Sequence, residues 1–363
     1  MNRFLASIPF AGFALLCNSC IGLLAQDVPL LLQLPYRPSI TVSTIPANGD
    51  MNPYGVAFVP SGFPTNGSVL PGDVLVSNFN SSANLQGTGT TILRVTSGGA
   101  ISTFFQVSRP AGLTTALGCL TTGFVIVGNL PTTNGSSGTV HQGSLVVLDR
   151  WGKVVLDLAN ETFLDGPWDL AIGEEGTTAQ VYVSSVLDGT VNRLDLVTGP
   201  GPSEVKLVSE TQIAYGYTFR FDPNALVIGP TGLAYDASSD QLYVASTGDN
   251  AIYSIAHAKN QVINVFQGML VYTDSVNLHG PLGLLLAPNG DLITSNGDAV
   301  NAGGLPNELV EFTKAGTFVA SYQVDSGAGG AAFGIAVQTT SSGIRFAAID
   351  DDTNTVTIWH MIQ

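Results

Sequence analysis

Side chains with amide or carboxylate oxygens recur just after short apolar segments of this chain. They are Asn78, Asn129, Asp188, Asp249, Asn250, Asn296, Asp298 and Asp351. Such oxygens accept hydrogen bonds from polar ligands, and they are the ligands that a hard cation such as Ca²⁺ prefers. Asn and Asp are also favoured in turns for backbone reasons, so each position has a purely structural interpretation as well. The pattern predicts a ring of polar groups wherever these segment ends meet.

A second set of residues sits in front of the apolar segments, within openings of the form Pro-x-Gly. The openings begin at Pro53, Pro110, Pro167, Pro230, Pro281 and, in a degenerate form, Ala332. The middle residue is aromatic in three of them, at Tyr54, Trp168 and Phe333. In the third opening Asp169 replaces the glycine. Its carboxylate could ligate a metal or accept a hydrogen bond from a ligand, or it could satisfy a local backbone amide.

The elements that position these residues are short strands in a repeated pattern. The openings recur roughly every 50 to 60 residues, which indicates an array of supersecondary units. In the fourth repeat, strands are expected over 232–235, 241–246 and 250–255, separated by turns. The 42 glycines and 19 prolines make turns frequent and long helices improbable. We therefore expect an all-β chain built from small antiparallel sheets.

Six such sheets cannot bury their faces alone, so they must stack around a ring. The sixth repeat ends after its third strand, at 355–359, and lacks sequence for a fourth. The alternating segment from Ser39 to Ile45 fits that role. We predict a six-bladed β-propeller of four-stranded antiparallel blades, closed by this N-terminal strand, which removes an exposed sheet edge.

The repeats resemble NHL repeats: Pro-x-Gly before an apolar run, then Gly-Asp before a second run ending in Ser/Ala-Asn/Asp. The likeness is best over 53–78, 230–255 and 281–296. It implies a propeller and leaves the activity open. In that strand order, the openings and the loops after the second strands surround one mouth of the central channel. The aromatic residues and the oxygen-bearing collar would then form a ligand site there, suited to a sugar or another neutral polar ligand.

Gluconolactonase-like propellers, a related family, hold a divalent metal in the channel with Glu, Asn and Asp. Their asparagine typically stands in an Asn-Gly-Leu opening, whereas this chain has Thr231 and Leu282 in the matching positions. Related lyases use several channel histidines, and only His279 lies near an opening here. The sequence also contains no Gly-x-Ser-x-Gly elbow, His-Glu-x-x-His or phosphate-binding loop.

These observations favour a non-catalytic scaffold that binds a small ligand, a sugar or a protein at the mouth, without a cofactor. The alternative is a metal-dependent hydrolase or lyase that uses channel carboxylates, with Asp169, Asp298 and Asp351 as the first to test. Ca²⁺ is the cation that such a cluster would favour.

Composition and the N-terminus bear on partners and location. Residues 1–26 carry one charge, Arg3, and a long apolar run, which predicts a secretory signal, or alternatively an uncleaved anchor. The propeller would then occupy 27–363 of a secreted or periplasmic protein. The formal net charge of −15 disfavours nucleic acid as a partner. We expect a monomer with no membrane contact beyond the signal segment.

Overall fold

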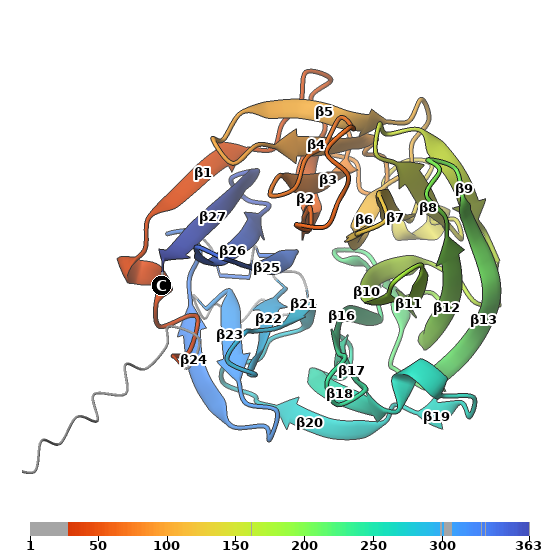
Figure 1. The fold of residues 1–363 in the computed structure, drawn as a ribbon. Helices are drawn as coiled ribbons and strands as arrows, with labels where there is room; N and C mark the ends of the chain where they lie inside the picture. The colour runs from red at the N-terminus through yellow and green to blue at the C-terminus, as the bar shows by residue number, and fades with distance from the viewer. Residues whose placement is uncertain are drawn as a thin grey trace, which may run out of the picture.

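A ring of six antiparallel sheets surrounds a central channel in the computed structural model of this chain (Figure 1). The structure describes residues 28–160, 162–297, 300, 307–327, 329–330 and 332–362. The predicted all-β, six-bladed architecture is confirmed. The predicted signal segment and Asp298 lie outside the described residues. Within the described residues, no helix is long and apolar enough to cross a membrane.

Blades 1 to 5 place their four strands in chain order from the channel outward, and blade 6 takes its outermost strand from the N-terminal part of the chain. Blade 1 consists of β2 (Met51–Phe58), β3 (Val74–Asn80), β4 (Thr91–Val95) and β5 (Ile101–Gln106). Blade 2 consists of β6 (Leu113–Leu120), β7 (Phe124–Asn129), β8 (Ser144–Asp149) and β9 (Val154–Leu158). Blade 3 consists of β10 (Pro167–Glu175), β11 (Thr178–Ser185), β12 (Thr190–Thr198) and β13 (Val205–Tyr215), with β19 (Val265–Phe266) added in parallel at its edge.

The remaining blades follow the same plan. Blade 4 consists of β16 (Pro230–Asp236), β17 (Gln241–Ser246), β18 (Ala251–Ala256) and β20 (Met269–Thr273). Blade 5 consists of β21 (Pro281–Leu286), β22 (Leu292–Asn296), β23 (Leu309–Phe312) and β24 (Phe318–Tyr322). Blade 6 consists of β25 (Ile335–Thr340), β26 (Gly343–Asp350), β27 (Thr355–Ile362) and β1 (Ser39–Ser43). Outside the blades lie the hairpin of β14 (Arg220–Asp222) and β15 (Leu226–Ile228), and the 3₁₀ turns η2 (Leu34–Tyr36), η3 (Ser137–Thr139) and η4 (Ala258–Asn260).

The N-terminal strand closes the ring as expected. β1 pairs antiparallel with β27, from Ser39 opposite Trp359 to Ser43 opposite Thr355. The segment before it is also fixed, because both oxygens of the buried Glu311 carboxylate accept 2.8 Å hydrogen bonds from the Leu30 and Leu31 amides. Burial raises the pKa of Glu311. β1 thus completes blade 6, and the segment that precedes β1 is fixed to blade 5 through Glu311.

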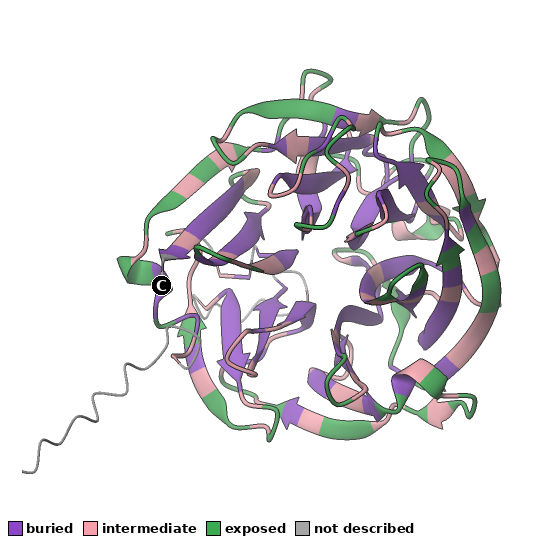
Figure 2. Cartoon of the chain, viewed as in Figure 1, coloured by how far each residue is buried: buried purple, intermediate pink, exposed green. Residues whose placement is uncertain are grey.

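Apolar side chains pack between neighbouring blades. Figure 2 shows that the inner strands are mostly buried and that the outermost strands are largely exposed. Between blades 1 and 2, for example, Leu75 and Ile92 pack with Val125 and Leu148, all of them buried. This arrangement explains why the inner strands are apolar on both faces, since each is covered by a blade on either side.

The openings at Pro53, Pro167, Pro230 and Pro281 form β-bulges on the inner strands. In β2 the pairing with β3 shifts between Pro53 and Val56, and equivalent shifts occur in β6, β10, β16 and β21. A bulge re-aims the side chain that it carries. This geometry turns the middle residue of the opening toward the channel.

The glycines of the openings permit an unusually close approach between blades. A Cβ atom added at Gly334 would lie 2.3 Å from the Tyr54 carbonyl oxygen, and one at Gly283 would lie 2.4 Å from the Phe333 carbonyl oxygen. A serine on the second strand fastens this contact: Ser295 Oγ accepts from the Gly283 amide at 2.7 Å and donates to the Phe333 carbonyl oxygen at 2.6 Å. Ser77 and Ser184 repeat this bridge in blades 1 and 3.

Two sequence predictions need correction. In blade 2 the position equivalent to Pro53 is Leu113, which pairs with Asn129, so Pro110 and Ala111 precede the strand and Thr114 takes the place at the channel. Gly112, at φ +60°, packs against Gly87 and makes this a separate turn. The period-two aromatic pattern of residues 215–221 predicts a strand, the outer one of blade 3. That strand instead ends at 215, and the rest enters the β14–β15 hairpin.

Candidate ligand site at the channel mouth

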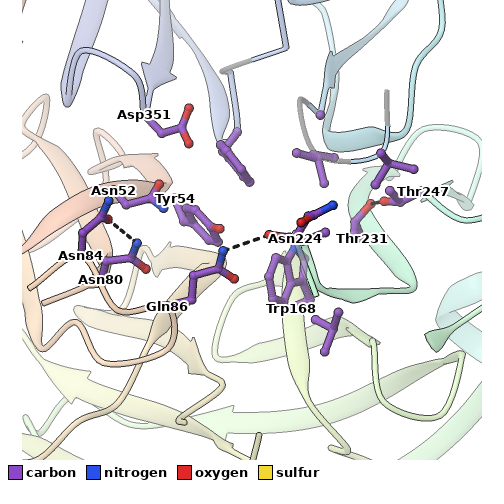
Figure 3. A pocket seen from close by; sticks show the side chains of 16 residues that line it. Asn52, Tyr54, Asn80, Asn84, Gln86, Trp168, Asn224, Thr231, Thr247 and Asp351 are labelled. Atoms are coloured by element: carbon purple, nitrogen blue, oxygen red, sulfur yellow. Dashed lines mark hydrogen bonds between the residues drawn. The ribbon is translucent and has the colours of Figure 1, made fainter. Parts of the chain in front are cut away.

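A pocket of about 180 Å³ opens at one mouth of the channel (Figure 3). The described residues that line it are Asn52, Tyr54, Asn80, Asn84, Gln86, Trp168, Asn224, Ala225, Val227, Thr231, Thr247, Leu282, Gly297, Val300, Phe333 and Asp351. The middle residues of five openings are among them, including the three predicted aromatic side chains. This volume is smaller than the roughly 300–1,000 Å³ of pockets that take drug-sized ligands.

The floor of the pocket is a packed aromatic cluster. The Tyr54 ring is stacked between the rings of Phe79 and Phe333, with centroids 4.3 and 4.2 Å away, and Trp168 is tilted against it at 5.7 Å. These side chains are nearly buried, with 4% of Tyr54, 3% of Trp168 and 7% of Phe333 exposed. Both faces of Tyr54 are therefore covered by other rings, so this residue cannot offer a face for a sugar to stack on. The floor shapes the pocket and separates it from the channel below.

The rim is rich in side-chain amides. Asn80 Nδ2 donates to Asn84 Oδ1 at 2.8 Å, and Asn52 is held by a 2.7 Å hydrogen bond from its backbone amide to Asn354 Oδ1. Asn52 and Asn84 both adopt the left-handed conformation, with φ of +57° and +53°. Asparagine tolerates this region better than most residues because its side chain hydrogen-bonds locally. The amides on this side of the pocket thus come from two fixed points of blade 1.

The β14–β15 hairpin covers the opposite side of the mouth. Gln86 Nε2 donates to the Asn224 carbonyl oxygen at 3.0 Å and joins the blade 1 loop to the hairpin (Figure 3). Asp222 Oδ1 accepts from the Asn224 and Ala225 amides and holds the hairpin turn. Leu226, buried in the cluster beneath, has φ of +65°, a conformation that costs a bulky residue about 1–2 kcal/mol. Backbone strain of this kind gathers at functional sites and persists only when its surroundings enforce it.

Most of the predicted polar collar supports the backbone instead of lining the pocket. Asn78 donates to the Thr44 carbonyl oxygen, Asn129 to that of Ser144, and Asn296 to those of Asn277 and Asn307. The other members of this group, which use their side chains in loops or turns, are Asp188, Asp249 and Asn250. None of these six is among the described lining residues. Of the predicted collar, Asp351 is placed at the pocket.

Asp169 lies deeper, in a separate channel cavity of about 70 Å³ below the aromatic floor. Its Oδ1 accepts from the Leu170 amide at 2.8 Å and its Oδ2 from the Leu233 amide at 3.2 Å. Burial raises the pKa of Asp169 to about 7, against these hydrogen bonds, which lower it. Asp169 lines this small cavity and is partly buried, and burial is the main cause of its raised pKa.

Sequence reasoning missed the lining residues Asn52, Asn84, Gln86, Asn224 and Val227. Asn52 directly precedes an opening, and Asn84 and Gln86 follow the second strand of blade 1 within a few residues. Their closeness in the sequence to an opening or to the end of a second strand is the feature that marks these three residues. Asn224 and Val227 carried none, because they reach the mouth on a hairpin that belongs to no blade.

The described residues contain no group of three or more His, Cys, Asp or Glu side chains placed to hold a metal ion. Asp169 and Asp351 do not converge, because Asp169 lies in the cavity below the floor and Asp351 lies at the mouth pocket above it. Thr231 and Leu282 stand where the lactonase resemblance would place asparagine. The donor groups of the described channel residues therefore do not fit the metal centre that the resemblance implied.

Comparisons with solved structures agree with the fold. A gluconolactonase from Xanthomonas campestris matches at 12% identity and a TM-score of 0.52, over 90% of this chain and 91% of that chain. Regucalcin from Agrobacterium tumefaciens, a calcium-binding protein, matches at 12% identity and 0.51, over 88% and 94%. The Malassezia sympodialis allergen Mala s 1 matches at 11% identity and 0.55, over 88% and 95%.

At these identities the likeness establishes the fold and no activity. No protein-family model matches the sequence, and no curated protein does. These fold matches, which include a gluconolactonase and regucalcin, support the propeller that the repeats predicted. None of these matching structures is named as an NHL-repeat protein.

Proposed function

We propose that this protein is an exported, NHL-like propeller that binds a small polar molecule at its channel mouth without catalysing a reaction on it. The observation that supports this most directly is the composition of the mouth pocket. Amide groups and one carboxylate surround a packed apolar floor, so the site is concave and presents fixed polar groups to a ligand. Its lining pairs no general base with a nucleophile, and no three His, Cys, Asp or Glu side chains of the described residues are placed to hold a metal ion.

A metal-dependent hydrolase is the second proposal, and one specific observation favours it. The solved propellers of similar fold include a gluconolactonase and a luciferin-regenerating enzyme. Asp169, a desolvated carboxyl inside the channel, is the residue that such an activity would most plausibly recruit. Against it, Asp169 lines the second channel cavity and is not among the described residues that line the mouth pocket.

The experiment compares the purified full chain with a variant whose pocket is filled. Val227 lines the pocket and is 6% exposed, so Val227→Phe places a ring in the cavity. Val208→Phe, at a position 64% exposed on β13, adds the same ring to the outside. A panel of hexoses, primary amines and lactones is screened by thermal shift. We expect at least one compound to stabilise the native protein and the Val208 variant but not the Val227 variant.

The same preparations are analysed for bound metal and for lactone hydrolysis with and without a chelator. The binding proposal expects no chelator-sensitive turnover. A stoichiometric divalent metal together with turnover that the chelator abolishes would reject it in favour of the hydrolase.

A further inference from the structure

Four polar atoms of the pocket-lining residues are buried without a hydrogen-bond partner among the described residues. They are the side-chain oxygens of Asn52, Asn80 and Gln86 and the indole Nε1 of Trp168. A buried polar group left unpaired costs about 1–3 kcal/mol, so such groups are rare unless something else satisfies them. Asn80 and Trp168 are only 2% and 3% exposed, so their side chains have little contact with bulk water.

The four atoms divide into two kinds on two sides of the pocket. The three amide side chains all come from the blade 1 segment and lie on one side, and Trp168 lies on the other (Figure 3). The amide oxygens need hydrogen-bond donors, whereas the indole N–H needs an acceptor. A molecule that satisfies both must carry donors at one end and an acceptor oxygen near the other.

Charge decides what kind of donor fits this pocket. Asp351 contributes a carboxylate to the lining, and the described lining residues include no Lys, Arg or His. In the covering hairpin, the exposed Arg220 guanidinium is paired with Asp222 at 3.8 Å. The chain as a whole carries a formal charge of −15, which attracts cations. An ammonium group offers three N–H donors and a positive charge, whereas hydroxyl groups supply single donors and no charge.

We propose that the mouth pocket recognises a small organic cation of the amino-alcohol class. Its ammonium group donates to the side-chain oxygens of Asn52, Asn80 and Gln86, with Asp351 as the counter-charge. Its hydroxyl oxygen accepts the hydrogen bond of Trp168 Nε1. The inference rests on the proposed binding function and narrows it, and it departs from the neutral sugar that the sequence favoured.

The test uses two ring compounds of the same size, trans-2-aminocyclohexanol and trans-1,2-cyclohexanediol, which differ by one ammonium group in place of one hydroxyl. Both are titrated into the full chain by isothermal titration calorimetry at pH 7. We expect the amino alcohol to bind at least about tenfold more tightly than the diol. Its affinity should also fall as salt is added, and the diol's should not.

Two variants separate the contributions. Asp351→Asn should weaken the amino alcohol and leave the diol unchanged, whereas Asp352→Asn, the same charge change at the exposed neighbour, should alter neither compound appreciably. Trp168→Phe keeps an aromatic floor and removes the N–H donor, so it should weaken both compounds. Thermal unfolding of each variant checks that it is folded.

The outcomes also distinguish this inference from the broader proposal. If the diol or a hexose binds as tightly as the amino alcohol, and Val227→Phe abolishes that binding, the cation inference is rejected and the mouth remains a ligand site. Equal effects of Asp351→Asn on both compounds would likewise reject it. If neither ring compound binds at about 10 mM, the inference is overturned. If the whole compound panel also fails, the binding function falls with it.

Discussion

Gln86 and Asn224, 138 residues apart in the chain, are joined by a 3.0 Å hydrogen bond from the Gln86 Nε2 to the Asn224 carbonyl oxygen. This bond ties the loop after β3 to the β14–β15 hairpin across the mouth pocket. The hairpin belongs to no blade, and its residue Leu226 has a strained, left-handed backbone conformation. The Gln86–Asn224 contact is therefore positioned to control how readily the pocket opens.

Replacing Gln86 by alanine should loosen the hairpin without unfolding the propeller. The bond is exposed, so its loss should cost less than about 1 kcal/mol of unfolding free energy. Hydrogen exchange of amides 220–228 should accelerate, because local opening becomes easier. Gln323→Ala is the control, since Gln323 makes a similar exposed bond to the Gly327 carbonyl oxygen far from this hairpin. Unchanged exchange in the hairpin of the Gln86 variant would show that the contact does not hold it closed.

Asp169 should make the protein less stable as the pH rises toward neutrality. Burial raises the pKa of this carboxyl to about 7 from an ordinary value of 3.8. Between these two values the unfolded chain has lost the proton that the folded chain keeps, so the free energy of unfolding falls as pH increases. The full effect, reached above pH 7, is on the order of 4 kcal/mol.

Asp169→Asn removes this titration, so the variant should gain stability relative to the native chain as the pH is raised from 4 to 8. Urea unfolding across this range measures the difference, with exposed Asp157→Asn as the control. A difference between native protein and the Asp169 variant that stays constant with pH would contradict the desolvated state of the carboxyl.

The close contact between inner strands should make the opening glycines intolerant of any side chain. In Gly334→Ala the new methyl would sit 2.3 Å from the Tyr54 carbonyl oxygen, which belongs to the backbone and cannot swing away. We expect a loss of about 1–3 kcal/mol in unfolding free energy. Gly138→Ala, where nothing lies within 4 Å of the added Cβ, should change stability by less than about 0.5 kcal/mol. Equal stability of the two variants would mean that the blades can separate at this point without cost.

The sequence repeat by itself determines the architecture. Short apolar strands with Pro-x-Gly openings specify blades because a sheet with two apolar faces must be covered on both sides. The sequence also predicts the closing strand, because polar and apolar residues alternate over Ser39–Ser43 and the sixth repeat has no sequence left for an outer strand. Tyr54, Trp168 and Phe333 line the mouth pocket, as their middle positions in the openings predict, and at Tyr54 and Trp168 a bulge in the inner strand accompanies this placement.

What only the tertiary structure decided is which polar residues face the pocket. Asn78 and Asn296 have the same local pattern as residues that would bind a ligand, yet they bond to backbone carbonyls of neighbouring loops. Asn224 reaches the mouth because the hairpin folds over it and not because of its place in a repeat. Local sequence sets the strands and their bulges through short-range periodicity. The direction of a polar side chain in a loop depends on which unsatisfied groups the folded ring brings near it.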